Sequence, residues 1–167
     1  MRPQDQPRAL NRPLWGALIV ALAAALGCNL TAYRPTPIPP TVGVGSFVNP
    51  HVRAGLSGVT AVQVQVREES GAYRSAGTIT GPNLDTLLVA LNVSVRTSAR
   101  AADCPDHLRL TFVRQDASQT MLTACLDGVV RLRGLPGAEA FDVPMYGATS
   151  DALSPYLPAE LQALLTF

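Results

Sequence analysis

Hydrophobic and polar residues alternate strictly from Val62 to Arg67, within the stretch TAVQVQVR. Valine occupies every second position, and glutamine or arginine lies between, which is typical of a strand with one buried face. The stretch EESGA then predicts a turn, and the chain is strand-like again from Tyr73 to Thr80. The pattern therefore predicts a β-hairpin at the start of the folded part of the chain.

The hydrophobic period changes to that of a helix in the next stretch, TGPNLDTLLVALN. Gly81 is an acceptable N-cap, and Pro82 then occupies the first helical position, which suits proline. Four leucines share one helical face by their i, i+3, i+4, i+7 spacing: Leu84, Leu87, Leu88 and Leu91. This spacing predicts an amphipathic helix that packs on the sheet.

Three further strands are expected in a meander, HLRLTFVR, TMLTACL and VVRLR. Asp127-Gly128, between the last two, is a strong two-residue hairpin signal. Shorter strands are expected at Val93 to Arg96 and at FDV, where Pro144 would end an edge strand. Leucines at helical spacing predict a second, shorter helix at the C terminus: Leu157, Leu161, Leu164 and Leu165.

These elements predict an α+β domain over residues 58–167. We expect an antiparallel sheet of about five strands, one central helix and a short C-terminal helix, with the helices on one face of the sheet. Residues 28–57 are rich in proline and glycine and show little hydrophobic period. They predict a linker that is extended like polyproline II around RPTPIPP.

The first residues of the chain have the pattern of an export signal. Arginines precede an uncharged run from Leu14 to Leu26, which is too short to cross a bilayer comfortably but suits a signal-peptide core. The stretch AALGC, which ends at Cys28, resembles the lipobox of bacterial lipoprotein signal peptides, in which a small residue precedes a lipidated cysteine. Ordinary secretion with cleavage nearby and an uncleaved anchor are the alternatives.

The lipobox resemblance implies a cellular location for the protein. Residues 1–27 would be removed as a lipoprotein signal peptide, and Cys28 would carry the lipid that holds the domain on the extracytoplasmic face of the cell membrane. The shortened chain would keep ten arginines and eleven acidic residues, with no lysine. This balance offers no basic excess for a nucleic-acid partner.

Cys104 and Cys125 form an even pair once Cys28 is acylated. Such a pair in an exported protein predicts a disulfide, which contributes about 3 kcal/mol by restricting the unfolded chain. The spacing is far from the C-x-x-C pattern of thiol oxidoreductases. We therefore expect a structural bond rather than a reactive one.

No catalytic or cofactor motif is present in the sequence, so we expect no catalytic residues and no cofactor. The disulfide would draw four polar residues to one end of the sheet: Asp103, Asp106, His107 and Asp127. Carboxylates and an imidazole suit a divalent cation. Ordinary turn and surface roles are the alternative reading of the same residues.

The region from Val59 onward resembles a recurrent kind of small bacterial lipoprotein domain. The resemblance rests on the hairpin, GPNLDTLLVALN and the cysteine pair around LRLTFVR and CLDGVVRL, and it implies a fold but no activity. We expect a non-catalytic module that binds a protein partner of the envelope. The alternatives are a module for a small ligand or metal, and a hydrolase with an unfamiliar site around His107.

Overall fold

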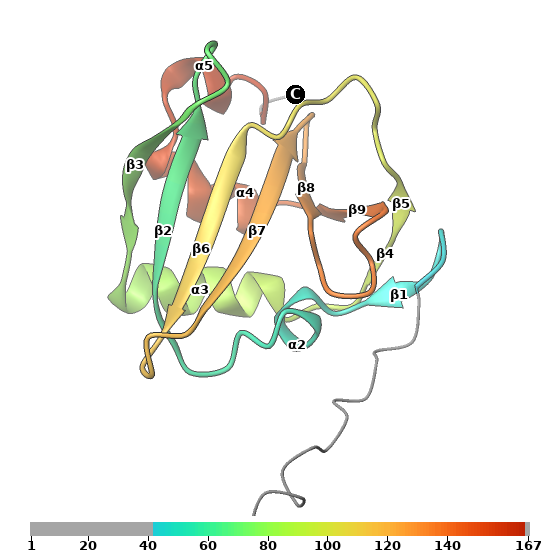
Figure 1. The fold of residues 1–167 in the computed structure, drawn as a ribbon, viewed down its shortest axis with the longest axis horizontal. Helices are drawn as coiled ribbons and strands as arrows, with labels where there is room; N and C mark the ends of the chain where they lie inside the picture. Colours follow the sequence, from blue (N-terminus) through green and yellow to red (C-terminus); the bar gives the residue numbers. More distant parts are fainter. Residues whose placement is uncertain (1–41, 166–167) are drawn as a thin grey trace, which may run out of the picture. The chain divides into compact units, whose positions relative to one another are not determined.

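The computed structural model of the protein describes residues 42–165, and Figure 1 shows how their helices and strands are arranged. The strands are β1 (Phe47–Val48), β2 (Val59–Arg67), β3 (Tyr73–Ile79), β4 (Val95–Arg96), β5 (Ser98–Ala99), β6 (Leu108–Arg114), β7 (Gln119–Leu126), β8 (Val130–Arg133) and β9 (Phe141–Met145). The helices are α2 (Pro50–Arg53), α3 (Gly81–Leu91), α4 (Ala148–Leu153), the 3₁₀ helix η1 (Ser154–Tyr156) and α5 (Ala159–Gln162).

The main sheet has seven antiparallel strands in the order β3-β2-β6-β7-β8-β9-β5. A second, two-stranded sheet pairs β1 with β4. Figure 1 shows α3 and α4 behind the long strands, on one face of the main sheet. The α+β class, the antiparallel sheet and the β2–β3 hairpin are therefore confirmed, while the sheet has more strands than predicted.

The core lies between the sheet and these helices. The valines of the alternating stretch in β2 are buried, and Gln63 between them is exposed, because successive side chains of a strand point to opposite faces. Leu108, Leu110 and Phe112 of β6 are fully buried by the same alternation. Leu84, Leu87 and Leu91 of α3 close the core, and Leu88 is partly buried beside them.

Strand β9 is longer than the sequence predicts, because Pro144 does not end it. The strand continues to Met145, and Pro144 pairs with Arg131 of β8. On its other side, β9 pairs with β5 only at Phe141 and Asp142. A proline, which has no N–H to donate, is tolerated where one side of the strand has no ladder partner.

The C-terminal region contains three short helices rather than one. Pro158 precedes α5 and separates it from η1, and the extended backbone at Leu157 interrupts the helical path. Leu157 is nevertheless buried, and Leu161 and Leu165 pack partly against the core. The leucine spacing thus identified three of the four apolar contacts, while Leu164 is exposed and proline divides the segment.

Residues 42–57, predicted as linker, belong to the folded unit. Leu56 is fully buried, and Val42, Val48 and Ala54 also lie in the core. The backbone N–H of Val42 donates to the carbonyl of Gly137 at 3.0 Å. The fold therefore begins at least sixteen residues before the predicted boundary at residue 58.

The remaining predictions for the N-terminal region lie outside the described residues. They concern the signal peptide over residues 1–27, the acylated Cys28 and the proline-rich stretch up to residue 41. Within residues 42–165, no helix combines the length and apolar character needed to cross a bilayer.

Candidate functional site at the disulfide end of the sheet

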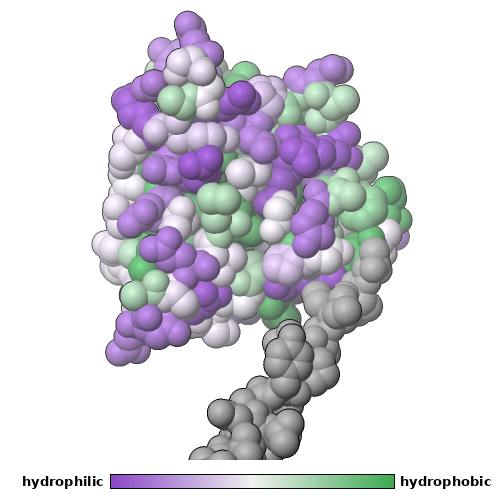
Figure 2. Space-filling model, viewed as in Figure 1, coloured by the Kyte–Doolittle hydropathy of each residue, from purple (hydrophilic) through white to green (hydrophobic). Residues whose placement is uncertain are grey.

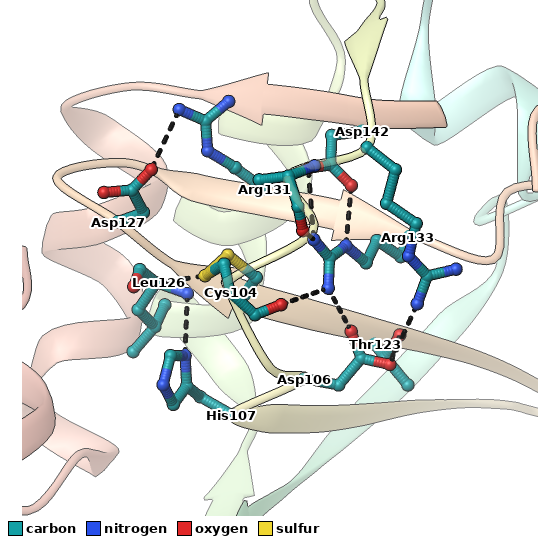
Figure 3. Close-up of a disulfide and its surroundings, with 12 residues drawn as sticks. Cys104, Asp106, His107, Thr123, Leu126, Asp127, Arg131, Arg133 and Asp142 are labelled. Carbon is teal, nitrogen blue, oxygen red and sulfur yellow. Dashed lines mark hydrogen bonds and ion pairs between the residues drawn. A yellow bond between two sulfur atoms is a disulfide. The ribbon is translucent and has the colours of Figure 1, made fainter. Parts of the chain in front are cut away.

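The predicted disulfide is present between Cys104, in the loop after β5, and Cys125 of β7, with a Cα–Cα distance of 5.8 Å (Figure 3). It holds the loop of residues 100–107 against the end of the main sheet. We call this region, with Arg133 and Asp142 beside it, the disulfide end. It contains the cysteine pair and the polar residues that the sequence analysis singled out as candidate ligands.

A buried ion pair lies next to the disulfide. Arg133 of β8 is 2% exposed, and Asp142 of β9 is fully buried. The Nε of Arg133 donates to Oδ1 of Asp142 at 2.6 Å, and its Nη2 donates to Oδ2 at 3.2 Å. The same carboxylate accepts the backbone N–H of Ala101 at 3.0 Å. Burial of both charges is tolerated because each is paired and hydrogen-bonded.

The guanidinium of Arg133 also ties the loop to the sheet (Figure 3). Its Nη1 donates to the carbonyl of Cys104 at 2.8 Å and to Oδ1 of Asp106 at 2.7 Å, and its Nη2 donates to the carbonyl of Ala101 at 3.0 Å. All five N–H donors of the side chain are thus engaged. The hydrogen bond that Arg133 donates to Asp142 is the main reason that the pKa of Arg133 is raised.

His107 has a structural hydrogen bond of its own. Its Nδ1 accepts the backbone N–H of Leu126 at 3.0 Å, so a neutral ring carries its proton on Nε2. Burial lowers the pKa of His107 below its ordinary value, and the positive charge of Arg133 lowers it further. The ring is therefore mainly neutral at pH 7, with neither nitrogen offering a free lone pair.

The predicted carboxylate ligands do not form one ligand set with His107, although Asp103 and Asp127 line the same hollow. Asp106 accepts hydrogen bonds from Arg133 and from the Thr123 hydroxyl, and Asp127 pairs with Arg131 at 3.2 Å. Among residues 42–165, the only cluster of three metal-ligating side chains is Cys104, His107 and Cys125, whose ligand atoms lie within 4.8 Å. Two of these three are joined as the disulfide, so the cluster is not a ligand set in this state.

Two open hollows flank the loop of residues 101–105. The first, of about 470 Å³, lies beside His107 and includes Asp103, Asp127 and Leu164 in its wall. The second, of about 450 Å³, contains Arg67, Arg100 and Arg133, with Asp106 as its one acidic residue. We call the second the arginine hollow. Both volumes fall in the range of ligand sites, but neither hollow has the predominantly apolar lining typical of such sites.

A different surface lies where the described chain begins. Phe47 and Val52 are 67% and 69% exposed, and they line an open hollow of about 310 Å³ with the buried residues Val42 and Val48. Ser46, Asn49 and Arg53 complete its rim. Figure 2 shows hydrophobic surface next to the start of the described chain. We call this feature the Phe47 hollow.

Local contacts hold the Phe47 hollow in shape. The side chain of Asn49 caps α2 by accepting the backbone N–H of Val52 at 3.1 Å, and it donates to Asn92 at 2.9 Å. The guanidinium of Arg96 lies 5.2 Å from the centre of the Phe47 ring, a cation–π contact across the β1–β4 pair. The sequence offers no periodic signal for this surface, because β1 and α2 are only two and four residues long.

Comparison with protein-family models, with curated proteins and with solved structures gave no match to this chain.

Proposed function

We propose that this protein is a lipoprotein, anchored through Cys28 on the extracytoplasmic face of the cell membrane, whose domain binds another envelope protein without catalysis. The resemblance of residues 24–28 to a lipobox supports the anchor. The Cys104–Cys125 disulfide supports an oxidising compartment, where such bonds persist.

The hydrogen bonding of His107 supports a non-catalytic role. A general base needs a lone pair directed at the proton it removes, but Nδ1 of His107 is occupied by the Leu126 N–H. Within residues 42–165, no serine, threonine or free thiol hydrogen-bonds to this imidazole. These observations weigh against a hydrolase centred on His107.

The main support for the proposal is the group of exposed apolar side chains at the Phe47 hollow. Protein interfaces concentrate binding energy in a few aromatic and apolar side chains that become buried at the centre, surrounded by polar groups. Phe47 and Val52 are exposed apolar anchors, and Ser46, Asn49 and Arg53 supply the polar rim. The concave shape suits an inserted side chain of a protein partner better than the broad surface of a bilayer.

Two experiments test the proposal. A photo-cross-linking amino acid replaces Phe47 in the full chain expressed in host cells, and the same substitution at Met121 is the matched control, since Met121 is 55% exposed on β7. We expect one reproducible protein adduct from position 47 and not from position 121. Adducts only to phospholipid, or the same proteins from both positions, would contradict the proposed role.

The anchor is tested separately by Cys28→Ser. Fatty-acid labelling of the wild-type chain should be lost in this variant, and the variant should no longer be cleaved before residue 28. Cys104→Ser is the control, because that thiol lies in the disulfide. Labelling that persists in Cys28→Ser would refute lipidation at this position.

A further inference from the structure

We infer that the arginine hollow binds an oxyanion, a carboxylate or phosphate group of a small polar ligand, through Arg67 and Arg100. The inference concerns a surface at the disulfide end and does not rest on the partner proposed for the Phe47 hollow. Three of the residues that line the arginine hollow are arginines, and one is acidic.

The charges of the arginine hollow do not cancel. Asp142 lies behind Arg133 and neutralises it through two hydrogen bonds. Among the described residues that line the hollow, Asp106 is then the one carboxylate, and its Oδ1 is already bound by Arg133 at 2.7 Å. One positive charge therefore remains in excess at the hollow, which favours an anionic ligand.

The two remaining guanidiniums have donors to offer. No hydrogen bond or ion pair joins the Arg67 side chain to another residue of the 42–165 range. Nη2 of Arg100 lies 3.6 Å from Oδ2 of Asp106, and these side chains are 49% and 24% exposed. A partly exposed pair at this distance contributes little, so Arg100 can turn toward a ligand at small cost.

The frame around the hollow is rigid, which favours binding because few groups must be ordered. The backbone N–H of Arg67 donates to the carbonyl of His107 at 2.8 Å. The Tyr73 hydroxyl donates to the carbonyl of Asp106 at 3.2 Å, and the guanidinium of Arg109 stacks on the Tyr73 ring at 4.0 Å. The disulfide and Arg133 fix the other side of the loop.

The lining defines the class of ligand. The planar fork of arginine matches the two oxygens of a carboxylate or phosphate, which it binds through paired hydrogen bonds. A volume of about 450 Å³ accommodates a ligand of about the size of a sugar acid or a sugar phosphate. The arginine side chains in the wall and the open mouth favour a charged, hydrophilic ligand over a hydrocarbon.

Isothermal titration of the full chain in a neutral, non-ionic detergent tests the inference with two probes, inorganic phosphate and glucuronate. We expect saturable binding of at least one probe that weakens as salt is raised. Arg67→Gln and Arg100→Gln should each weaken it about tenfold or more. The control is Arg74→Gln, an exposed arginine that pairs with Glu68 at 3.4 Å outside the hollow and should bind as the wild type does.

The two probes distinguish the oxyanions, since a phosphate-selective site retains the first and a carboxylate-selective site the second. No saturable binding of either probe would overturn the inference. Binding that survives both Arg67→Gln and Arg100→Gln, or that falls equally in Arg74→Gln, would overturn it as well. Thermal unfolding of each variant confirms that it is folded, and cross-linking from position 47 reports independently on the proposed partner.

Discussion

Charged side chains are buried at the disulfide end of the domain, whereas apolar side chains are exposed at its N-terminal end. Arg133 and Asp142 lie out of water, and every donor of the guanidinium is engaged. Phe47 and Val52 are mostly exposed, with only Arg96 stacked over the phenyl ring. The buried ion pair thus stabilises the fold, while the exposed apolar side chains of the Phe47 hollow are available to contact a partner.

The largest expected effect comes from removing the buried cation. Arg133→Met leaves the Asp142 carboxylate buried without its counter-charge, which should lower the free energy of unfolding by about 3–5 kcal/mol. The matched control is Arg131→Met, whose partly exposed pair with Asp127 contributes at most about 1 kcal/mol. Urea unfolding of both variants measures the difference, and equal losses would show that Arg133 is not the stabilising centre of the disulfide end.

The next largest loss of stability is expected from a substitution within residues 42–57, and it tests whether this segment is part of the domain. Leu56 is fully buried, so Leu56→Ala should lower the free energy of unfolding by about 2–5 kcal/mol. Val52→Ala, at an exposed position four residues earlier in the same segment, should change it by no more than about 0.5 kcal/mol. A neutral Leu56→Ala would mean that the segment does not contribute to the core.

Loss of the disulfide should have a comparable or somewhat smaller effect. The double variant Cys104→Ser/Cys125→Ser removes a bond between two residues that are 21 positions apart in the sequence. It should be about 3 kcal/mol less stable, because the unfolded chain is no longer restricted by the bond. Combining it with Arg133→Met tests whether the bond and the ion pair act together. Effects that add without interaction would contradict the view that both hold the same loop.

The long strands and α3 were predictable because each displays several residues of its period. The β2 valines, the β6 apolar positions and the α3 leucines all lie in the core as the pattern requires. The disulfide was predictable from the even pair of cysteines that remains once Cys28 is set aside as the expected lipidation site. These features depend on local sequence, so they can be predicted from a single amino-acid sequence.

The remaining features depend on contacts between distant segments. Strand alternation places Arg133 of β8 on the face opposite Leu132. The loop of residues 101–106 and the carboxylate from β9 then cover that face. The residues next to Arg133 and Asp142 in the sequence do not indicate that these two side chains are buried together. Residues 42–57 escaped prediction for a related reason, since two- to four-residue elements show no period.

A smaller effect is expected from His107 as the pH changes. Its pKa is lowered in the folded protein, so between that value and the unfolded value near 6.5 the unfolded chain binds more protons. The free energy of unfolding should therefore fall as the pH decreases from about 7.5 to about 5.5. Hydrogen bonds lower the pKa values of Asp116 and Glu139, but these carboxyls act at more acidic pH.

Urea unfolding across that range measures the slope. His107→Gln should reduce it, because this substitution removes the buried imidazole. An identical slope in wild type and His107→Gln would show that burial of this imidazole has no part in the pH dependence.

The most direct test of a partner at the Phe47 hollow is the effect of Phe47→Ser on complex formation in host cells. The full-length wild type, Phe47→Ser and Met121→Ser are cross-linked chemically in intact cells and purified, and the attached protein is quantified by mass spectrometry. Both substituted side chains are exposed, so neither variant should lose its fold. We predict that one protein is captured by the wild type and by Met121→Ser, and that Phe47→Ser captures at least tenfold less. Undiminished capture by Phe47→Ser, or no protein captured by the wild type, would contradict the proposed function.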